Sequence, residues 1–257
     1  MKKTPLRSLA GATIVLAALA CAPAAQAKTM ACGKPMTEAQ KVQRLLDIHE
    51  IKNVASLHEY YHTALMHSEE LRDVWSKRDD IVWTNNTDKY IGQASMKRFY
   101  VDGMPKDRAG AMWYHMLTTP VIEVAGDGKT AKGIWMSFGN VSGAMFNQPA
   151  AAQWTQEKYG IDFVKEGGRW KIWHLRTYVD FYTAIDKNWL DPKHNLAAPQ
   201  EQAAAGAGVK AEPGVSFEGM TPDERGNYYE GYHLKRQPKL EPRLPEPYCT
   251  FKDTFSY

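Results

Sequence analysis

Three absences narrow what this chain can do. Beyond its first 27 residues, no apolar run approaches the about 20 residues that a membrane-spanning helix needs. The sequence has no glycine-rich phosphate loop and no Gly-x-Ser-x-Gly motif, which argues against a nucleotide-binding enzyme and a serine hydrolase. It has no HxH or HExxH motif, and only His58 and His62 have the spacing of a chelating pair, with no suitably spaced acid evident nearby. We therefore expect neither a metal nor another cofactor.

The chain also lacks an excess of charge once its N-terminal leader is set aside. The leader combines Lys2, Lys3 and Arg7 with an apolar stretch and the small-residue site Ala-Gln-Ala at 25–27, the pattern of a signal peptide. Without those three basic residues, 29 of the 32 Lys and Arg remain against 29 Asp and Glu. Nucleic acid is not an expected partner, because phosphate binding needs a basic surface. We predict a signal peptide over residues 1–27, cleavage after Ala27, and a periplasmic or secreted protein.

Cysteine is scarce, with three residues in the whole chain. Cys21 lies in the leader, where a lipid anchor is the alternative fate, although Ala-Leu-Ala before it is a poor lipoprotein site. Cys32 and Cys249 remain, one near each end of the processed chain. Because exported proteins commonly form disulfides, a bridge between these two cysteines is one prediction. Two free thiols are the alternative.

Hydrophobic periodicity places helices before strands. A capping box at 37–40 begins an apolar pattern of helical spacing that runs to residue 65, and a second short helix is predicted over 68–75. A short strand over 81–83 and a helical turn over 95–100 follow. Four further strands are predicted, over residues 119–125, 132–141, 159–165 and 170–181. This order predicts an α+β fold with an antiparallel meander.

The composition changes after the last predicted strand. Residues 192–214 are rich in alanine, glycine and glutamine and are typical of a flexible linker. Residues 215–257 are proline-rich but carry many aromatic residues, which is unusual for a disordered tail. We therefore predict an α+β domain over 36–190, a linker, and a C-terminal extension that packs on its own domain or on a neighbouring subunit.

Several motifs between residues 48 and 186 follow the order of these elements. They are Ile51-Lys-Asn with Tyr60-Tyr61, Asp80-Ile-Val-Trp-Thr-Asn85, His115 ahead of the segment 120–128, Tyr159-Gly-Ile-Asp-Phe163, and Gly168-Arg-Trp-Lys-Ile-Trp-His174. Together they resemble the SnoaL-like group of the nuclear-transport-factor-2-like superfamily. The resemblance implies a cone-shaped α+β barrel, in which a curved antiparallel sheet wraps on the N-terminal helices around a cavity. With the tyrosine-rich extension, the motifs resemble the bacterial diarylpropane lyases, which act on lignin-derived dimers.

The strongest catalytic candidate is His115. Related dehydratases have a histidine at this point that faces the cavity and moves a proton, and imidazole suits that task near neutral pH; a core histidine is the alternative. On the long helix Tyr60 or Tyr61 is a candidate pocket hydroxyl, with helix–sheet packing as the alternative. The acid that the related enzymes carry on this helix is missing, and Met66 or His67 stands near its place.

The last predicted strand offers a second set of candidates. Simple alternation places Trp170, Ile172, His174, Arg176 and Tyr178 on one face. Polar groups among apolar ones are typical of a ligand pocket. An outer or subunit-facing surface is the alternative for the same residues.

The remaining candidates are substrate contacts. Asn85 and Asn86 end a short strand, where they either face the cavity mouth or form a turn. Asp162 lies between apolar residues and needs a partner, for which Arg176 is a candidate. An aromatic box, with core packing as its alternative, comprises Trp83, Trp135 and Tyr159.

By resemblance, the chain is predicted to be a cofactor-independent lyase that deformylates a diarylpropane diol to a stilbene, with release of formaldehyde, by acid–base catalysis. The alternatives are a dehydratase or isomerase of a polycyclic or steroid-like alcohol, and a non-catalytic exported binding module. Titratable groups converging on one place would indicate an enzyme, whereas histidines pointing away from an apolar cavity would indicate a binder. The expected partners are a small aromatic substrate and further copies of the chain, in a dimer or trimer.

Overall fold

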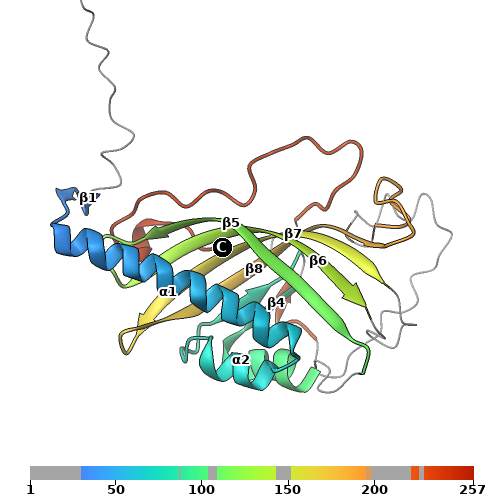
Figure 1. The fold of residues 1–257 in the computed structure, drawn as a ribbon, viewed down its shortest axis with the longest axis horizontal. Coiled ribbons are helices and arrows are strands. Elements are labelled where there is room, and N and C mark those ends of the chain that lie inside the picture. The colour runs from blue at the N-terminus through green and yellow to red at the C-terminus, as the bar shows by residue number, and fades with distance from the viewer. Residues whose placement is uncertain are drawn as a thin grey trace, which may run out of the picture.

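A computed structural model describes residues 30–86, 88–103, 109–142, 152–195, 197, 221–225 and 229–257. The predicted signal peptide and most of the predicted linker lie outside these residues. The helices precede the long strands, as the periodicity predicted (Figure 1). The fold is a mixed α+β arrangement with a curved, unclosed sheet. Within the described residues, no helix is both long and apolar enough to cross a bilayer.

Two helices form one side of the molecule. Helix α1 (Glu38–Thr63) begins with the predicted capping box, in which Thr37 accepts from the backbone of Gln40 and the side chain of Gln40 accepts from Thr37. The chain then reverses at Leu65, whose φ of 57° lies in the left-handed region, and α2 (His67–Asp73) begins two residues later. The reversal turns α2 back toward the last turns of α1.

A seven-stranded sheet forms the other side, in the order β5-β6-β7-β8-β3-β4-β9. Its strands are β3 (Val82–Thr84), β4 (Asp88–Ile91), β5 (Met112–Val124), β6 (Thr130–Ser142), β7 (Gln153–Glu166), β8 (Arg169–Ala184) and β9 (Glu224–Arg225). β5 to β8 form the predicted antiparallel meander, and β3 joins β8 in parallel. The smaller elements are β1 (Met30–Ala31), β2 (Lys34–Pro35), α3 (Gly92–Met96), the π-helix η2 (Lys97–Gly103) and the 3-10 helix η3 (Phe251–Asp253).

The apolar core lies between α1 and the concave face of the sheet, which α1 crosses in Figure 1. Ile51 on α1, Trp75 after α2, and Phe163 and Ile172 on the strands are all fully buried in it. Burying such side chains contributes roughly 1.5–3 kcal/mol each relative to exposure. The core therefore fixes the helices against the sheet and positions the polar groups beside it.

A β-bulge changes the alternation of β8. Ile172 and His174 pair with successive residues of β7, so Trp173 between them has no partner in that register. Trp170 and Ile172 lie in the core, whereas His174 lies on the opposite, outer face against the C-terminal extension. The prediction that these residues share one face is therefore wrong, because the bulge inserts one extra residue into the period of two.

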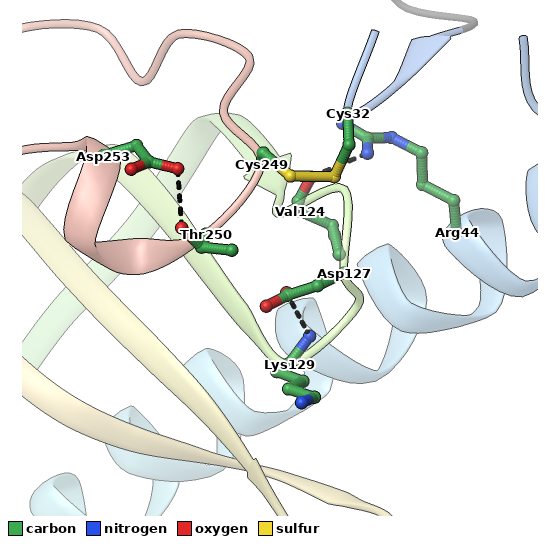
Figure 2. The surroundings of a disulfide bond; sticks show 8 residues. All are labelled: Cys32, Arg44, Val124, Asp127, Lys129, Cys249, Thr250 and Asp253. Atoms are coloured by element: carbon green, nitrogen blue, oxygen red, sulfur yellow. Dashed lines mark hydrogen bonds between the residues drawn. A yellow bond between two sulfur atoms is a disulfide. The ribbon is translucent and has the colours of Figure 1, made fainter. Parts of the chain in front are cut away.

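The described part of the C-terminal extension packs on its own domain, and a disulfide anchors it. Cys32 and Cys249 are bonded, as one of the two alternatives predicted (Figure 2). Beside them, the backbone N–H groups of Gly126 and Asp127 donate to the carbonyls of Tyr248 and Cys249, at 2.8 and 3.1 Å. The extension is thus fixed to the β5–β6 turn.

Removing this disulfide is expected to lower the free energy of unfolding by up to about 5 kcal/mol. The bridge closes a loop of 217 residues, and closing so long a loop restricts the unfolded chain strongly. The measurement is urea denaturation of the Cys32→Ser/Cys249→Ser double variant beside oxidised and reduced wild type. The variant and the reduced protein should share one midpoint; a midpoint equal to that of the oxidised protein would contradict the expectation.

Candidate active site

Seven buried or nearly buried titratable side chains meet between the two helices and the sheet. This group, the histidine–glutamate cluster, consists of His58, Glu59, His62, His67, Glu70, His115 and Glu157. Its rings lie close together: the centre of the His62 ring is 5.1 Å from that of His67 and 5.6 Å from that of His115. Such a concentration of buried polar groups is costly to fold and is typical of functional sites.

Local helix geometry explains how the cluster is assembled. His58 and His62 are four residues apart on α1 and stack at 5.9 Å on the face that points to the sheet. The reversal at Leu65 then brings the first turn of α2 against them, and His67 and Glu70 share one face of that helix at a spacing of three. Helix α1 also carries Glu59, and strands β5 and β7 supply His115 and Glu157.

Glu70 is the centre of the helical part. Its Oε1 accepts from His58 Nδ1 at 2.7 Å and from Trp75 Nε1 at 3.0 Å. Burial favours the neutral acid, but His58 overrides it and lowers the pKa of Glu70 to about 2. Burial likewise opposes the charge on His58, yet Glu70 raises the pKa of that ring. The two side chains therefore form a buried ion pair.

Glu59 is in the opposite state. Neither of its carboxyl oxygens has a hydrogen-bond partner within the described part of the chain, and the ring of His58 lies 3.6 Å away. Burial raises the pKa of Glu59 to about 8; His58 opposes the rise, and the charges of Glu157 and Glu70 add to it. The carboxyl is therefore protonated at neutral pH and can donate a proton.

A proton acceptor lies in the same cluster. Burial lowers the pKa of His62 well below its ordinary value, so this ring is neutral, and its Nδ1 is buried without a hydrogen-bond partner among the described residues. His115 Nδ1 lies 3.5 Å from Glu157, whose carboxylate accepts from Thr155 Oγ1 at 2.8 Å. Each buried polar group left without a partner costs about 1–3 kcal/mol, so the fold retains these groups at the expense of stability.

Aromatic side chains border the cluster. The rings of Tyr100 and Trp113 lie 6.4 and 5.4 Å from that of His62, and the ring of Tyr159 lies 6.2 Å from that of His58. Burial raises the pKa of both tyrosines well above the ordinary value, so their hydroxyls stay protonated. The cluster is therefore bordered by aromatic rings, two of which carry protonated hydroxyl groups.

Three of the predicted site residues meet here: His67, His115 and Tyr159. The two helix tyrosines do not, since Tyr60 is 76 % exposed and Tyr61 donates to Asp73 at 3.1 Å. The other two members of the predicted aromatic box follow the core-packing alternative. Trp83 stacks on Phe99 at 4.5 Å, and Trp135 meets Phe163 edge-on.

The two asparagines have structural partners. Asn85 Oδ1 accepts from the backbone of Asp88 at 2.7 Å, which confirms the turn alternative. The side chain of Asn86 donates to the carbonyl of Val179 and accepts from its N–H, at 3.0 and 2.8 Å. Asn86 therefore ties the end of β3 to β8.

Asp162 lies on the outer face of the sheet, where it forms a second buried polar group. It is paired with Lys132 and accepts from His174 Nδ1 at 2.8 Å, rather than from Arg176 as the sequence predicted. Ser256 from the extension contacts both Asp162 and the same ring nitrogen of His174, at 2.6 and 3.0 Å. Because serine and carboxylate share one nitrogen, the trio cannot relay a proton as a catalytic triad does.

Arg176 and Tyr178 share this outer face. The guanidinium of Arg176 lies over the ring of Tyr178 at 4.7 Å, and Tyr178 meets Tyr229 of the extension edge-on. The ring of Tyr257 lies against Gly160, where a Cβ would come within 2.6 Å of it. The face predicted to line a pocket is thus covered by the extension.

The acids of the cluster were missed from the sequence. Glu70 follows His67 by three residues, a spacing that could have been recognised once both were assigned to one helix. Glu59 and Glu157 carry no motif, and only the fold brings them to the histidines. The expectation that no acid accompanies the histidines is therefore wrong.

A groove of about 850 Å³ lies elsewhere, within the extension. Its walls include Leu240, Leu244, Pro247 and Phe255, and none of its lining residues belongs to the cluster. The groove and the acid–base groups are therefore separate features.

The chain was compared with known proteins. No curated protein matches its sequence. A hexachlorocyclohexane dehydrochlorinase (LinA) type 2 is 15% identical, with a TM-score of 0.46 over 58% of this chain and 95% of that one. The LinA-type3 dehydrochlorinase of Novosphingobium barchaimii is 16% identical, with a TM-score of 0.45 over 58% and 96%. An NTF2-like protein of Novosphingobium aromaticivorans is 13% identical, with a TM-score of 0.41 over 58% and 89%. The family model of the SnoaL-like domain matches residues 43–176, just over half of the sequence, and the chain therefore belongs to the SnoaL-like domain family.

Proposed function

We propose that this protein is a lyase that acts on a hydroxylated aromatic small molecule by acid–base catalysis in the histidine–glutamate cluster. The observation that carries the proposal is the convergence of a buried, protonated Glu59 with histidines whose ring nitrogens lack partners among the described residues. A group poised to give a proton near neutral pH and others able to take one are what elimination requires. A non-catalytic binding module has no need of such a costly arrangement.

The proposed reaction is the deformylation of a 1,2-diarylpropane-1,3-diol. Glu59 gives its proton to the benzylic hydroxyl, which leaves as water, while the substrate's own phenolate supplies the electron pair and becomes a quinone methide. His115, beside Glu157, then takes the hydroxyl proton of the terminal CH2OH group. The bond to that carbon breaks, formaldehyde leaves, and the electron pair forms the stilbene double bond and restores the phenolate. Proton exchange returns Glu59 and His115 to their starting states. The substrate is its own electron sink, so the chain needs only to position proton donors and acceptors and to exclude water.

Two observations support this substrate class. Aromatic rings border the cluster at Tyr100, Trp113 and Tyr159. The sequence motifs, together with the tyrosine-rich extension, resemble the diarylpropane lyases. A plain dehydration of another alcohol uses the same groups, and the products distinguish the two reactions, because dehydration releases no formaldehyde.

The test follows a purified full-length protein mixed with a 1,2-diarylpropane-1,3-diol. The expected result is growth of the near-ultraviolet stilbene band with one formaldehyde released per stilbene. His115→Ala should lower the rate by about 10²–10⁴-fold, whereas His194→Ala, at a partly exposed histidine outside the cluster, should leave it unchanged. Alkene formation without formaldehyde would replace the lyase by a dehydratase. No product at high protein concentration would overturn the assignment for this substrate.

A further inference from the structure

Three members of the cluster are arranged as ligands of one ion. Each of His62, His67 and Glu70 offers one ligand atom, and these three atoms lie within 4.8 Å of one another. Glu70 Oε2 is 3.5 Å from His67 Nδ1 and 4.0 Å from His62 Nδ1. Ligands about 2.0–2.2 Å from a tetrahedral ion are roughly 3.3–3.5 Å apart, so one pair already has this spacing and the others need only small side-chain movements.

Among the residues that the structure describes, these ligand atoms have no hydrogen-bond partner. Both ring nitrogens of His67, Nδ1 of His62 and Oε2 of Glu70 are buried and form no hydrogen bond within the part of the chain that the structure describes. The side chains of His67 and Glu70 are only 3 % and 0 % exposed. Buried polar groups are nearly always satisfied, so three orphaned atoms, one from each residue, that lie this close together indicate a missing ligand.

The surroundings hold Glu70 in a ligating orientation. His58 and Trp75 both donate to its Oε1, which leaves Oε2 directed at the two other histidines. Hydrogen bonds of this kind from neighbouring residues orient the carboxylates of protein metal sites and contribute to their affinity. An ion pair between Glu70 and His58 alone would not require His62 and His67 to face the same carboxylate.

We propose that His62, His67 and Glu70 bind one divalent transition-metal ion of the Zn²⁺ type. Two imidazoles and a carboxylate suit this class, whereas Ca²⁺ and Mg²⁺ require a shell of oxygen ligands. Three protein ligands leave a fourth position open for water or substrate. The inference goes beyond the proposed function, because ion binding is measured without any substrate. The sequence argument against a metal had considered only His58 and His62 as a pair.

The test titrates untagged, chelator-treated full-length protein with Zn²⁺ by calorimetry and with Co²⁺ by visible absorption. The expected result is one ion per chain, intense Co²⁺ bands typical of a tetrahedral site, and a higher Tm with Zn²⁺. His67→Gln should weaken binding at least about 100-fold. Because the ring of His67 forms no hydrogen bond among the described residues, this variant is expected to fold, and circular dichroism checks that it does.

A matched control uses a second histidine–carboxylate pair. His194 and Asp191 have the same spacing of three residues and the same 3.5 Å separation, but they are only partly buried and have no third ligand within the described residues. His194→Ala should bind as wild type does. Absence of binding to wild type, or equal binding by wild type and His67→Gln, would overturn the proposal. If a protein that binds no Zn²⁺ still forms product, the lyase proposal holds and the metal-site proposal fails. If the ion binds but no product forms, the metal-site proposal holds and the lyase proposal fails.

Discussion

Replacing Glu59 by glutamine is expected to lower kcat for elimination by about 10²–10⁴-fold. Glutamine has nearly the shape of a protonated carboxyl but cannot give up a proton, so the benzylic hydroxyl would leave without acid assistance. Because the shape is preserved, KM should change little. The measurement is initial rate against substrate concentration for wild type and Glu59→Gln. An unchanged kcat would remove Glu59 from the reaction.

The same substitution should stabilise the fold above about pH 5. The pKa of Glu59 is about 8 in the folded protein against 4.5 for an ordinary glutamate, so the folded chain keeps a proton that the unfolded chain releases. The free energy of unfolding therefore falls as pH rises from 4.5 to 8, and by pH 7 the loss is about 3 kcal/mol. Glutamine does not titrate and removes this loss.

Urea denaturation at pH 5, 6 and 7 checks the stability effect. The advantage of Glu59→Gln over wild type should grow steadily with pH across this series. Glu246→Gln, at an exposed position, serves as the control and should show no such trend. A constant difference at the three pH values would mean that Glu59 does not hold its proton. Gain of stability with loss of rate is the pattern expected of a catalytic group.

Asp162→Ala is expected to cost about 3–5 kcal/mol of folding free energy, the largest stability effect predicted for this chain alongside loss of the disulfide. The substitution leaves the ammonium of Lys132 buried, because both members of the pair are fully buried on the outer face of the sheet. Rings of Phe251, Phe255 and Tyr257 surround that ammonium at 4.6–5.0 Å. They attract the cation, but they cannot replace the carboxylate.

A double variant separates the lost pair from a general disturbance of this face. Lys132→Met/Asp162→Leu removes both charges together, and replacing a buried ion pair by apolar residues is often neutral or stabilising. Urea denaturation should therefore show the double variant to be more stable than Asp162→Ala. If both lose the same free energy, the carboxylate matters for packing or for its contacts with His174 and Ser256 rather than for the charge of Lys132.

Local physics explains which elements could be predicted from the sequence. The start of α1 depends on residues adjacent in sequence, so the capping box at Thr37 was sufficient. Strand β5 begins at Met112, seven residues before its predicted start. Pro120 interrupts the strand pattern, and the structure accommodates it in a register shift between Thr118 and Val121. β4 and β9 were missed because strands of two to four residues depend on their pairing partners more than on their own pattern.

The site was predictable only where one residue type carries the chemistry. His67 and His115 could be named because imidazole is rare and functional near neutral pH. Glu59, Glu70 and Glu157 look like ordinary surface glutamates in the sequence. Their place in the cluster depends on the reversal at Leu65 and on strand register, and neither has a local signature.

The bulge at Trp173 sets which face of the sheet each of the following residues of β8 occupies. Ile172 before it and Leu175 after it both face the core, although they are three residues apart. Removing Trp173, the unpaired residue, would leave Ile172, His174 and Leu175 on their present faces. Losing the bulge with every residue kept would instead turn His174 toward α1 and Leu175 toward the extension, as far along the strand as the next register shift, opposite Gln156 and Glu157. In this part of the chain, the pairing register is therefore as strict a requirement as the identity of the residues.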